Sequence, residues 1–258
     1  MEEKLILTER KDFIGIITVN RPEVRNALNK EAWRQLHEAF TELDNDDGIR
    51  VIILTGAGDK AFIAGADLSV LKTRSSVETF YGVNQKIVTD IETLSKPTIA
   101  MINGFCLGGG LEVAMACDIR VAGDSAKFGQ TELNVGILPG CGGTQRLARY
   151  VGLGKARELI FTGKIITAQE AEQIGLVNCV VPQPVLLEKS LEMANAIAAK
   201  SPIVTRIAKL VVNRGIESDL TSGLQAELLA QSLVFSTEDH LEGINAFLEK
   251  REPKFTGK

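Results

Sequence analysis

One glutamate stands out in an otherwise apolar stretch of this chain. In INGFCLGGGLEVAMACDIRV, which runs from Ile102 to Val121, Glu112 follows three consecutive glycines and a leucine. No lysine or arginine lies between Lys96 and Arg120, so the neighbouring sequence offers this carboxylate no cation. Burial without a cation raises the pKa of a carboxyl group, and a pKa near neutrality suits general acid–base chemistry. Glu112 is therefore a candidate catalytic acid or base.

A second glutamate repeats this pattern. Glu132 lies among glycine turns in FGQTELNVGILPGCGGTQR, and no cation occurs between Lys127 and Arg146. Either glutamate alone is more simply explained as a hydrogen-bonded or partly solvated acid. Two such glutamates beside glycine turns favour a catalytic pair, which could activate water and deliver a proton to a carbon next to a carbonyl group.

Two clusters of small residues could supply main-chain donors. They are IAGADL, from Ile63 to Leu68, and LGGGLE, from Leu107 to Glu112. Small side chains leave N–H groups uncovered, and at a helix start these groups lack internal partners and carry partial positive charge. We expect the two clusters to hold one oxyanion between them. Glycines that merely let strands turn and backbones pack closely are the alternative for each cluster taken alone.

Other catalytic schemes fit this chain less well. The segment GAGDKA follows a strand-like run and matches a dinucleotide-binding fingerprint, but no clear helix comes after it. His37 and His240 are the only histidines, and the chain has no G-x-S-x-G motif. No spacing of histidines and cysteines suggests zinc, so we expect neither triad hydrolysis nor a metal site.

Composition indicates a water-soluble globular protein. The 258 residues are 45% hydrophobic and 24% charged, enough for one α/β core with a helical extension. The formal charge of -4 argues against nucleic acid or an anionic membrane as a partner, and no apolar run approaches about 20 residues. The start of the chain resembles no signal or transit segment, so we expect a cytoplasmic protein. Four cysteines without C-x-x-C spacing are expected to be reduced: Cys106, Cys117, Cys141 and Cys179.

Strand-like runs alternate with helical patterns in the first half of the chain. We expect strands at 14–20, 51–56 and 98–104, and helices from the capping residue Asn29 to about Leu43 and over 77–94. Past Gly140 the pattern is mainly helical, with helices expected at 152–161, 168–174, 185–199, 203–214, 220–235 and 238–249. VIILTGAGDKAFIAGADL and TIAMINGFCLGGGLEV share one order of strand, glycine turn and small-residue cluster, which suggests a repeated unit.

Several motifs together resemble the crotonase superfamily, and most closely enoyl-CoA hydratase. The resemblance covers nearly the whole chain. Its motifs are RPEVRNAL from Arg21, AFIAGADL from Ala61, KPTIAMINGFCLGGGLEVAMACD from Lys96, FGQTELNVGILPGCGGTQRL from Phe128, TGKIITAQEAEQIGLVNCVV from Thr162, and the closing FLEKREPKF.

The resemblance implies an α/β fold and a substrate class. The crotonase-like fold is a spiral of ββα units, expected over residues 1–195, followed by a C-terminal helical trimerisation region over 196–258. It also implies trimers stacked as hexamers. The implied substrates are coenzyme A thioesters, with no cofactor beyond the coenzyme A that enters as part of the substrate.

The resemblance also assigns residues by motif position. Ala66 and Gly109 would supply the two N–H groups of an oxyanion hole, and Glu112 and Glu132 would be the catalytic pair, with Glu112 as base toward water and Glu132 as proton donor. The residues expected to contact coenzyme A are Arg25, Ala64, Asp67 and Leu68, joined from the helical tail by Phe247 and Lys250. Cys141 departs from the familiar alanine, and we expect it to have a packing role.

Two alternatives remain open at this stage. One is another crotonase-type reaction, such as isomerisation of a double bond or hydration of a branched or cyclic enoyl-CoA. The other is an RNA-binding relative that uses the fold as a scaffold, since Lys30, Arg34 and His37 share one helical face. Glu31 and Glu38 flank this face and make it a thin basic patch.

Overall fold

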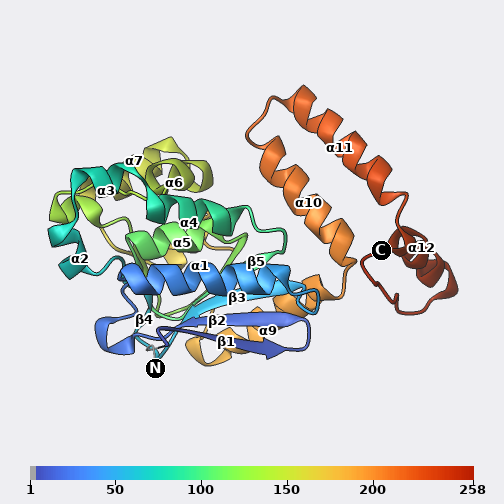
Figure 1. Ribbon diagram of the computed structural model, residues 1–258, viewed down its shortest axis with the longest axis horizontal. Helices are drawn as coiled ribbons and strands as arrows, with labels where there is room; N and C mark the ends of the chain where they lie inside the picture. Colours follow the sequence, from blue (N-terminus) through green and yellow to red (C-terminus); the bar gives the residue numbers. More distant parts are fainter. Residues whose placement is uncertain (1–3) are drawn as a thin grey trace.

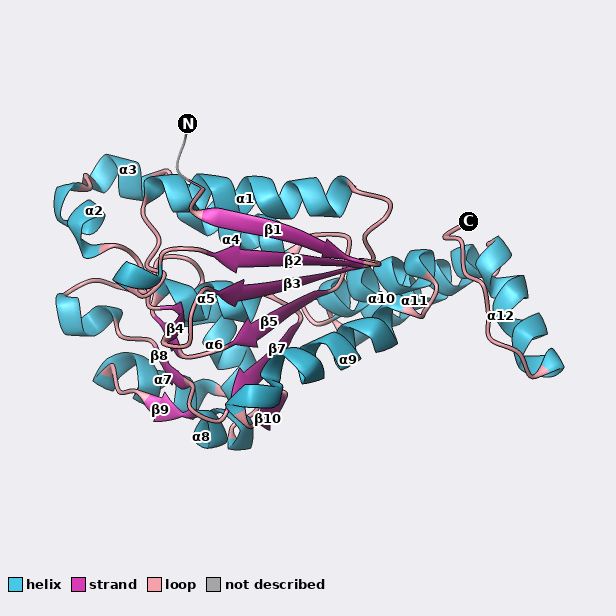
Figure 2. Ribbon diagram, turned by 90° about the horizontal axis from the view of Figure 1, so that it is seen from below, coloured by secondary structure: helices cyan, strands magenta, loops and turns pink. Residues whose placement is uncertain are grey.

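Six strands form the larger of two sheets in the computed structural model, which describes residues 4–258 (Figures 1 and 2). Their order is β1 (Ile6–Lys11), β2 (Ile14–Val19), β3 (Val51–Gly56), β5 (Thr98–Ile102), β7 (Ile119–Gly123) and β10 (Cys179–Val181). Only the β1–β2 pair is antiparallel. All residues of β3 and β5 are buried, which explains why both appear as continuous apolar runs in the sequence. The three predicted strands are thus confirmed.

A smaller sheet is formed mainly by the strands that follow β3, β5 and β7 in the chain. It contains β4 (Ala61–Ile63), β6 (Phe105–Leu107), β8 (Lys127–Gly129) and β9 (Ile166–Thr167), in that order. β3 leads into β4, β5 into β6 and β7 into β8, so each unit gives one strand to each sheet. The repeat predicted from two segments therefore occurs three times. Because β4 pairs with β6, the two small-residue clusters that follow these strands are brought together.

Helices cover both faces of the larger sheet. On one face, α1 (Lys30–Asn45), α4 (Val83–Glu92) and α5 (Gly109–Ala116) share the main core with inward residues of β2, β3 and β5. On the other, α9 (Leu186–Ala198) packs on the alternate residues of the same strands. The side chain of Asn29 caps α1 by accepting a hydrogen bond from the N–H of Ala32, as the sequence predicted.

One predicted helix is wrong in its extent. The pattern over 77–94 corresponds to two helices, α3 (Ser76–Phe80) and α4, and the short α2 (Leu68–Thr73) precedes them. The break occurs at Gly82, whose left-handed conformation, with φ at 60°, cannot continue a right-handed helix. Apolar periodicity does not reveal such a break, because apolar residues recur at helical spacing both before and after Gly82 in the sequence.

The remaining helices are short. η1 (Pro22–Val24) lies in the first half of the chain, and η2 (Glu132–Val135), α6 (Gly143–Val151), α7 (Leu153–Thr162), α8 (Ala168–Gln173) and η3 (Gln183–Val185) lie in the second half. α7 and α8 match predicted helices, whereas α6 was not predicted. Its start, Gly143 and Thr144 after the cap residue Gly142, resembles a loop in the sequence, but α6 packs against α5 and α7.

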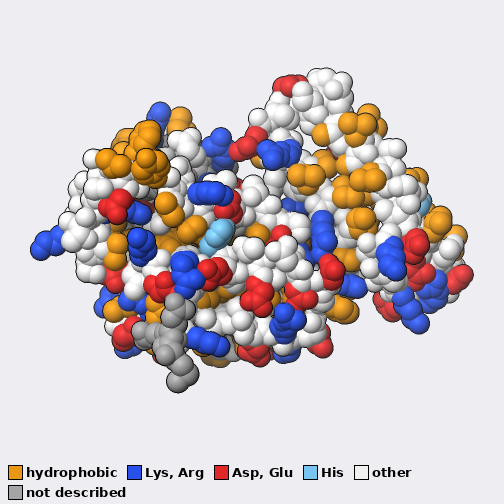
Figure 3. All heavy atoms as spheres, viewed as in Figure 1, with side chains coloured by type: hydrophobic (Ala, Val, Ile, Leu, Met, Phe, Trp, Pro, Cys, Tyr) orange, Lys and Arg blue, Asp and Glu red, His pale blue; other side chains and the backbone are white. Residues whose placement is uncertain are grey.

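Three C-terminal helices extend away from this core (Figure 1). They are α10 (Pro202–Gly215), α11 (Leu220–Val234) and α12 (Glu238–Glu249). The division expected at residues 195 and 196 falls inside α9, which packs on the sheet as far as Ala198. None of the residues of α10 or α11 is buried, and apolar side chains gather on their surface (Figure 3). No helix within residues 4–258 has both the length and the apolar character needed to cross a membrane.

Candidate active site

The two small-residue clusters meet where α5 approaches β4. The helix comes so close that a Cβ atom on Gly110 would lie 2.0 Å from the carbonyl oxygen of Ile63. Real Cβ contacts are not this short, so only glycine allows this packing. The close approach sets the start of α5 beside the segment from Ala64 to Asp67.

The N–H groups of Ala66 and Gly109 flank one small space. Leu28 pairs with this segment through two hydrogen bonds, to the oxygen of Gly65 at 2.9 Å and from the N–H of Asp67 at 3.0 Å, so the pairing skips the N–H of Ala66. Gly109 begins α5, and a first-turn N–H has no partner within its helix. A Cβ atom on Gly109 would lie 3.9 Å from the nitrogen of Ala66. Two such N–H groups on neighbouring residues are candidates for stabilising a developing oxyanion.

Glu112 borders the same space from the first turn of α5. Its side chain is 2% exposed, and its Oε1 accepts hydrogen bonds from the N–H groups of Cys141 and Gly143, each at 2.7 Å. Its Oε2 would lie 3.9 Å from a Cβ atom on Gly109. Burial raises the pKa of Glu112, and the two backbone hydrogen bonds oppose this effect by stabilising the ionised form.

Glu132 reaches the space from η2. Its Oε1 accepts a hydrogen bond of 2.8 Å from Gln130 Nε2, and its carboxyl carbon would lie 3.4 Å from a Cβ atom on Gly108. Burial first, and then the negative charge of Glu112, raise the pKa of Glu132 to about 7. Near neutral pH Glu132 can therefore carry and release a proton.

The combined arrangement has the parts needed for proton transfer beside an oxyanion. The two carboxyl groups approach the adjacent residues Gly108 and Gly109, and the amide of Gly109 is one of the two candidate oxyanion donors. The groups differ in their partners, two backbone amides for Glu112 and one side-chain amide for Glu132, so their protonation states are set differently. Within residues 4–258 no group of three or more histidine, cysteine, aspartate or glutamate side chains is placed to hold a metal ion.

Four of the residues expected to contact coenzyme A lie around the first cluster. The N–H of Ala64 donates to the oxygen of Arg25 at 3.1 Å, and the Arg25 guanidinium stands over the ring of Phe105. The side chain of Asp67 caps α2, and its hydrogen bond from Ser69 holds its pKa below the usual range. Leu68 is exposed and starts α2. With the Asp67 carboxylate engaged, this segment offers mainly its main chain to a ligand.

The other two expected contacts lie far from this site. Phe247 is exposed near the end of α12, and Lys250 is the residue that ends this helix. In Figure 1, α12 and α2 occupy opposite ends of the molecule, because α10 leads the chain away from the core. The structure therefore does not bring Phe247 and Lys250 to the site formed by their own chain.

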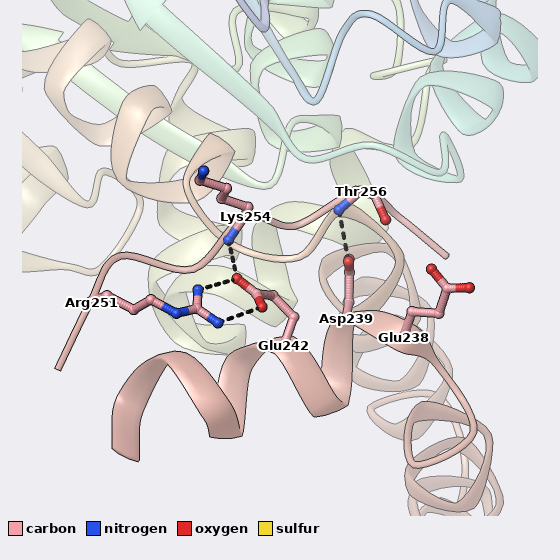
Figure 4. A pocket seen from close by; sticks show the side chains of 6 residues that line it. All are labelled: Glu238, Asp239, Glu242, Arg251, Lys254 and Thr256. Atoms are coloured by element: carbon pink, nitrogen blue, oxygen red, sulfur yellow. Dashed lines mark hydrogen bonds and ion pairs between the residues drawn. The ribbon is translucent and has the colours of Figure 1, made fainter. Parts of the chain in front are cut away.

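A pocket beside α12 does not replace them. Figure 4 shows its six lining residues: Glu238, Asp239, Glu242, Arg251, Lys254 and Thr256. The carboxylate of Glu242 accepts from the Arg251 guanidinium and from the N–H of Lys254, and Asp239 accepts from the N–H of Thr256. These charges bind the tail to its own helix, so this pocket holds the C-terminus in place.

Two rival functions lose their structural basis. The GAGDKA segment leads from β3 into β4, so the helix required by a dinucleotide fold is missing there. On the face of α1 considered for RNA, Arg34 forms ion pairs with Glu31 and Glu38, and His37 Nε2 lies 3.0 Å from Asp90. Acidic partners thus cancel much of the positive charge on this face.

Some residues of the site were not recognised in the sequence. The side chain of Gln130 donates a hydrogen bond to Glu132, two residues further along the chain. The main-chain N–H groups of Cys141 and Gly143, which are distant in sequence from Glu112, donate hydrogen bonds to its carboxylate. Backbone donors leave no signature in side-chain types, which is why these two were missed. Cys141 is buried, as its expected packing role requires, and burial raises its thiol pKa far above the usual value.

Comparisons with known proteins agree on one family. The model of the enoyl-CoA hydratase/isomerase family matches residues 9–258. A short-chain-enoyl-CoA hydratase of Clostridium acetobutylicum is 44% identical, over 98% of this chain and 97% of its own. A crotonyl-CoA hydratase of Syntrophomonas wolfei is 43% identical, over 98% of each chain. The crystal structure of an enoyl-CoA hydratase from Bacillus anthracis superposes with a TM-score of 0.95 at 43% identity, covering 98% of this chain and 100% of that one.

Proposed function

The chain belongs to the enoyl-CoA hydratase/isomerase family, and we propose that it adds water to a trans-2-enoyl-CoA to give a 3-hydroxyacyl-CoA. The substrates named for the two relatives above, short-chain enoyl-CoA and crotonyl-CoA, make a short acyl chain the first choice. The observation that carries the proposal is the convergence at Gly109. One point beside this residue lies 3.9 Å from both the nitrogen of Ala66 and Glu112 Oε2, and Glu132 approaches the preceding residue.

In this proposal the thioester oxygen binds between the N–H groups of Ala66 and Gly109. Hydrogen bonds from both amides stabilise negative charge on this oxygen as the enolate-like transition state develops. Each donor contributes about 3 to 4 kcal/mol, as single oxyanion donors do in other enzymes. Withdrawal of electrons toward the oxygen makes Cβ electrophilic.

The two glutamates divide the proton transfers. Glu112, held by two backbone N–H groups that favour its ionised form, takes a proton from the attacking water while the water oxygen bonds to Cβ. Glu132, with a pKa of about 7, gives its proton to Cα. The product gains one hydroxyl group and one hydrogen, and proton exchange between the two glutamates and water restores the starting state. No redox change or cofactor other than the substrate's coenzyme A enters this scheme.

Coenzyme A binding extends the proposal to the whole assembly. The main chain of Ala64, Asp67 and Leu68 would border the adenine, and Arg25 would attract the phosphates. Phe247 and Lys250 would come from a neighbouring subunit of a homo-oligomer, proposed to be a hexamer built from two trimers. The exposed apolar surface of α10 and α11 supports an assembly of this kind. We also propose a cytoplasmic location, supported by four free cysteines.

Hydration of crotonyl-CoA in water enriched in oxygen-18 tests the proposal. We expect the enoyl absorbance to disappear and the product to be a 3-hydroxyacyl-CoA that carries one heavy oxygen. Branched, cyclic and longer enoyl-CoA substrates, assayed in parallel, rank the acyl preference. Migration of the double bond without oxygen incorporation would instead identify an isomerase and refute hydration.

A further inference from the structure

Three buried polar atoms without a hydrogen-bond partner belong to the region around this site. Within residues 4–258, the buried side-chain atoms that lack such a partner are Trp33 Nε1, Asp46 Oδ2, Gln130 Oε1 and Glu132 Oε2. Asp46 Oδ2 lies 2.6 Å from the Arg10 guanidinium and is therefore ion-paired. Gln130 and Glu132 are already part of the site, which leaves the indole N–H of Trp33 to explain. A buried donor without an acceptor costs about 1 to 3 kcal/mol, so native proteins keep few of them.

Trp33 borders the space between the oxyanion donors and Glu112. Its side chain is 3% exposed, and its ring atom Cζ2 would lie 3.8 Å from a Cβ atom on Gly109. The same point is 3.9 Å from the nitrogen of Ala66 and from Glu112 Oε2. Cζ2 is bonded to the ring carbon that carries Nε1. The unpartnered Nε1 is therefore only two bonds away from the ring atom that lies closest to the site.

The chain just before Trp33 pairs with the segment that contains Ala66. Leu28 forms a bridge with Ala66, and Asn29 immediately caps the helix that carries Trp33. Trp33 lies at the end of the first turn, only five residues after Leu28. Its main-chain N–H, not the indole N–H, donates to the oxygen of Asn29 at 3.0 Å. A shift of α1 would thus move the ring and the Ala66 segment together. This coupling gives the indole a defined position relative to anything bound at Ala66.

We infer that Trp33 is a substrate-binding residue, whose indole N–H donates a hydrogen bond to an oxygen of the bound acyl-CoA thioester. Indole is a donor only, and the described residues provide no acceptor for it. A thioester substrate supplies both a carbonyl oxygen for the N–H and an apolar carbon chain for the ring edge. The inference rests on the proposed function, because it takes acyl-CoA as the ligand of this site.

Tryptophan emission tests this contact without any substitution. Trp33 is the only tryptophan of the 258 residues, so all tryptophan emission comes from this ring. Butyryl-CoA, a saturated thioester that cannot be hydrated, is titrated into the protein, with excitation where adenine does not absorb. We expect a saturable change in emission whose Kd equals the inhibition constant of butyryl-CoA against hydration. Coenzyme A without an acyl group should change the emission much less. Unchanged emission at saturating butyryl-CoA would overturn the inference.

A pair of variants separates the hydrogen bond from packing. Trp33→Phe keeps an aromatic ring but removes the N–H. Phe40→Leu is the matched control, because Phe40 is a buried aromatic residue two turns further along the same helix. We expect Trp33→Phe to lower kcat/KM for crotonyl-CoA about tenfold, equivalent to about 1.4 kcal/mol. Phe40→Leu should lower Tm by at least as much and leave kcat/KM within twofold of the wild type.

The outcomes distinguish this inference from the proposed function. Equal losses of kcat/KM in the two variants, or no loss in Trp33→Phe, would assign Trp33 to the core alone while hydration by the wild type still stood. Absence of hydration by the wild type would refute the proposed function. In that case the emission titration would still decide whether a thioester contacts the indole.

Discussion

The two carboxyl groups of the site are the same chemical group in two different environments. Glu112 receives two backbone hydrogen bonds that favour its charge, whereas Glu132 receives one side-chain hydrogen bond and faces the charge of Glu112. Like charges at close range cannot both ionise without cost, so one of the two acids holds its proton longer. In the proposed mechanism these surroundings favour Glu112 as the base and Glu132 as the acid.

The pH dependence of hydration follows from these environments. Glu132 must be protonated to act as a proton donor, and its pKa is about 7, so kcat/KM should fall as the pH rises through about 7. Glu112 must be ionised, so kcat/KM should also fall on the acidic side, at a pH above the usual glutamate pKa of 4.5. The expected profile is a bell, measured as kcat/KM for crotonyl-CoA. A profile that stays flat from pH 6 to pH 9 would contradict these assignments.

The raised pKa of Glu132, which suits catalysis, should lower the stability of the folded protein. A glutamate whose pKa rises from 4.5 to about 7 on folding destabilises the native state above pH 7, because the folded protein holds the charge less well than the unfolded chain does. Glu132→Gln removes this cost. We expect its free energy of unfolding to exceed that of the wild type by about 3 kcal/mol at pH 8, with the gain shrinking as the pH falls toward 4.5. Urea unfolding at both pH values measures it, and an equal gain at both would argue against a titration effect.

At this scale the sequence predicts acidic groups better than their partners. Glu112 and Glu132 were recognisable because each is a lone carboxylate in a cation-free, glycine-rich stretch. Trp33 was not recognisable, since a tryptophan on an amphipathic helix usually belongs to the core. Its missing hydrogen-bond partner is a property of three-dimensional packing that no spacing in the sequence reveals.

At the scale of elements, adjacent glycines of α5 serve different purposes. A Cβ atom on Gly109 would meet only ordinary contacts, the nearest at 3.8 Å, but it would lie 3.9 Å from the nitrogen of Ala66, where the thioester oxygen is proposed to bind. A Cβ atom on Gly110 would collide with the carbonyl of Ile63. The first glycine leaves room for a ligand, and the second lets the helix pack.

Alanine substitution should separate these two purposes. We expect Gly109→Ala to fold with a Tm equal to or slightly above that of the wild type, since alanine favours a helix by up to about 1 kcal/mol over glycine. Its kcat/KM should fall at least about 100-fold, the usual effect of disturbing one oxyanion donor. Gly110→Ala, the matched control, should lose stability instead. Thermal unfolding and initial rates check both variants, and a fully active Gly109→Ala would mean that the oxygen binds elsewhere.

Element prediction succeeded where burial is complete and failed where strands are short. β2, β3 and β5 were predicted because they are strand-like segments of five or six residues, rich in isoleucine and valine or in other apolar residues. The smaller sheet consists of two- and three-residue strands, too short for any periodicity, and its existence had to come from the resemblance. The third repeat was missed because β7 carries Arg120, whose buried guanidinium bonds the backbone oxygens of Cys117 and Leu176.

At the scale of the whole molecule, the C-terminal helices present a surface that a single chain leaves uncovered. The exposed apolar residues of α10 and α11 include Leu210, Val212, Leu220, Leu224, Leu228, Leu229 and Leu233. Burying a leucine side chain contributes about 1.5 to 3 kcal/mol, so association through this face would be strongly favourable. The sequence predicted these helices, but not the partner surface that covers them.

Oligomerisation through this face can be tested with one added charge. We expect the wild type to be a homo-oligomer, and Leu228→Glu to weaken its association at least about 100-fold, because a charge would be buried in place of an apolar side chain. Gln173→Glu adds the same charge at an exposed polar position of α8, outside the C-terminal helices, and should leave the assembly intact. Light scattering after size-exclusion chromatography gives the masses. A monomeric wild type would contradict the proposed assembly.

The central claim is that two backbone amides and two glutamates together add water to an enoyl thioester. Turnover of crotonyl-CoA by Glu112→Gln, Glu132→Gln and the double variant tests it most directly, with butyryl-CoA binding and Tm as controls. The account predicts that each single variant folds, binds butyryl-CoA, and loses about 100- to 10,000-fold in kcat. The double variant should lose little more than the worse single variant, because the two groups act as a unit. A single variant that hydrates crotonyl-CoA at the wild-type rate would contradict the account.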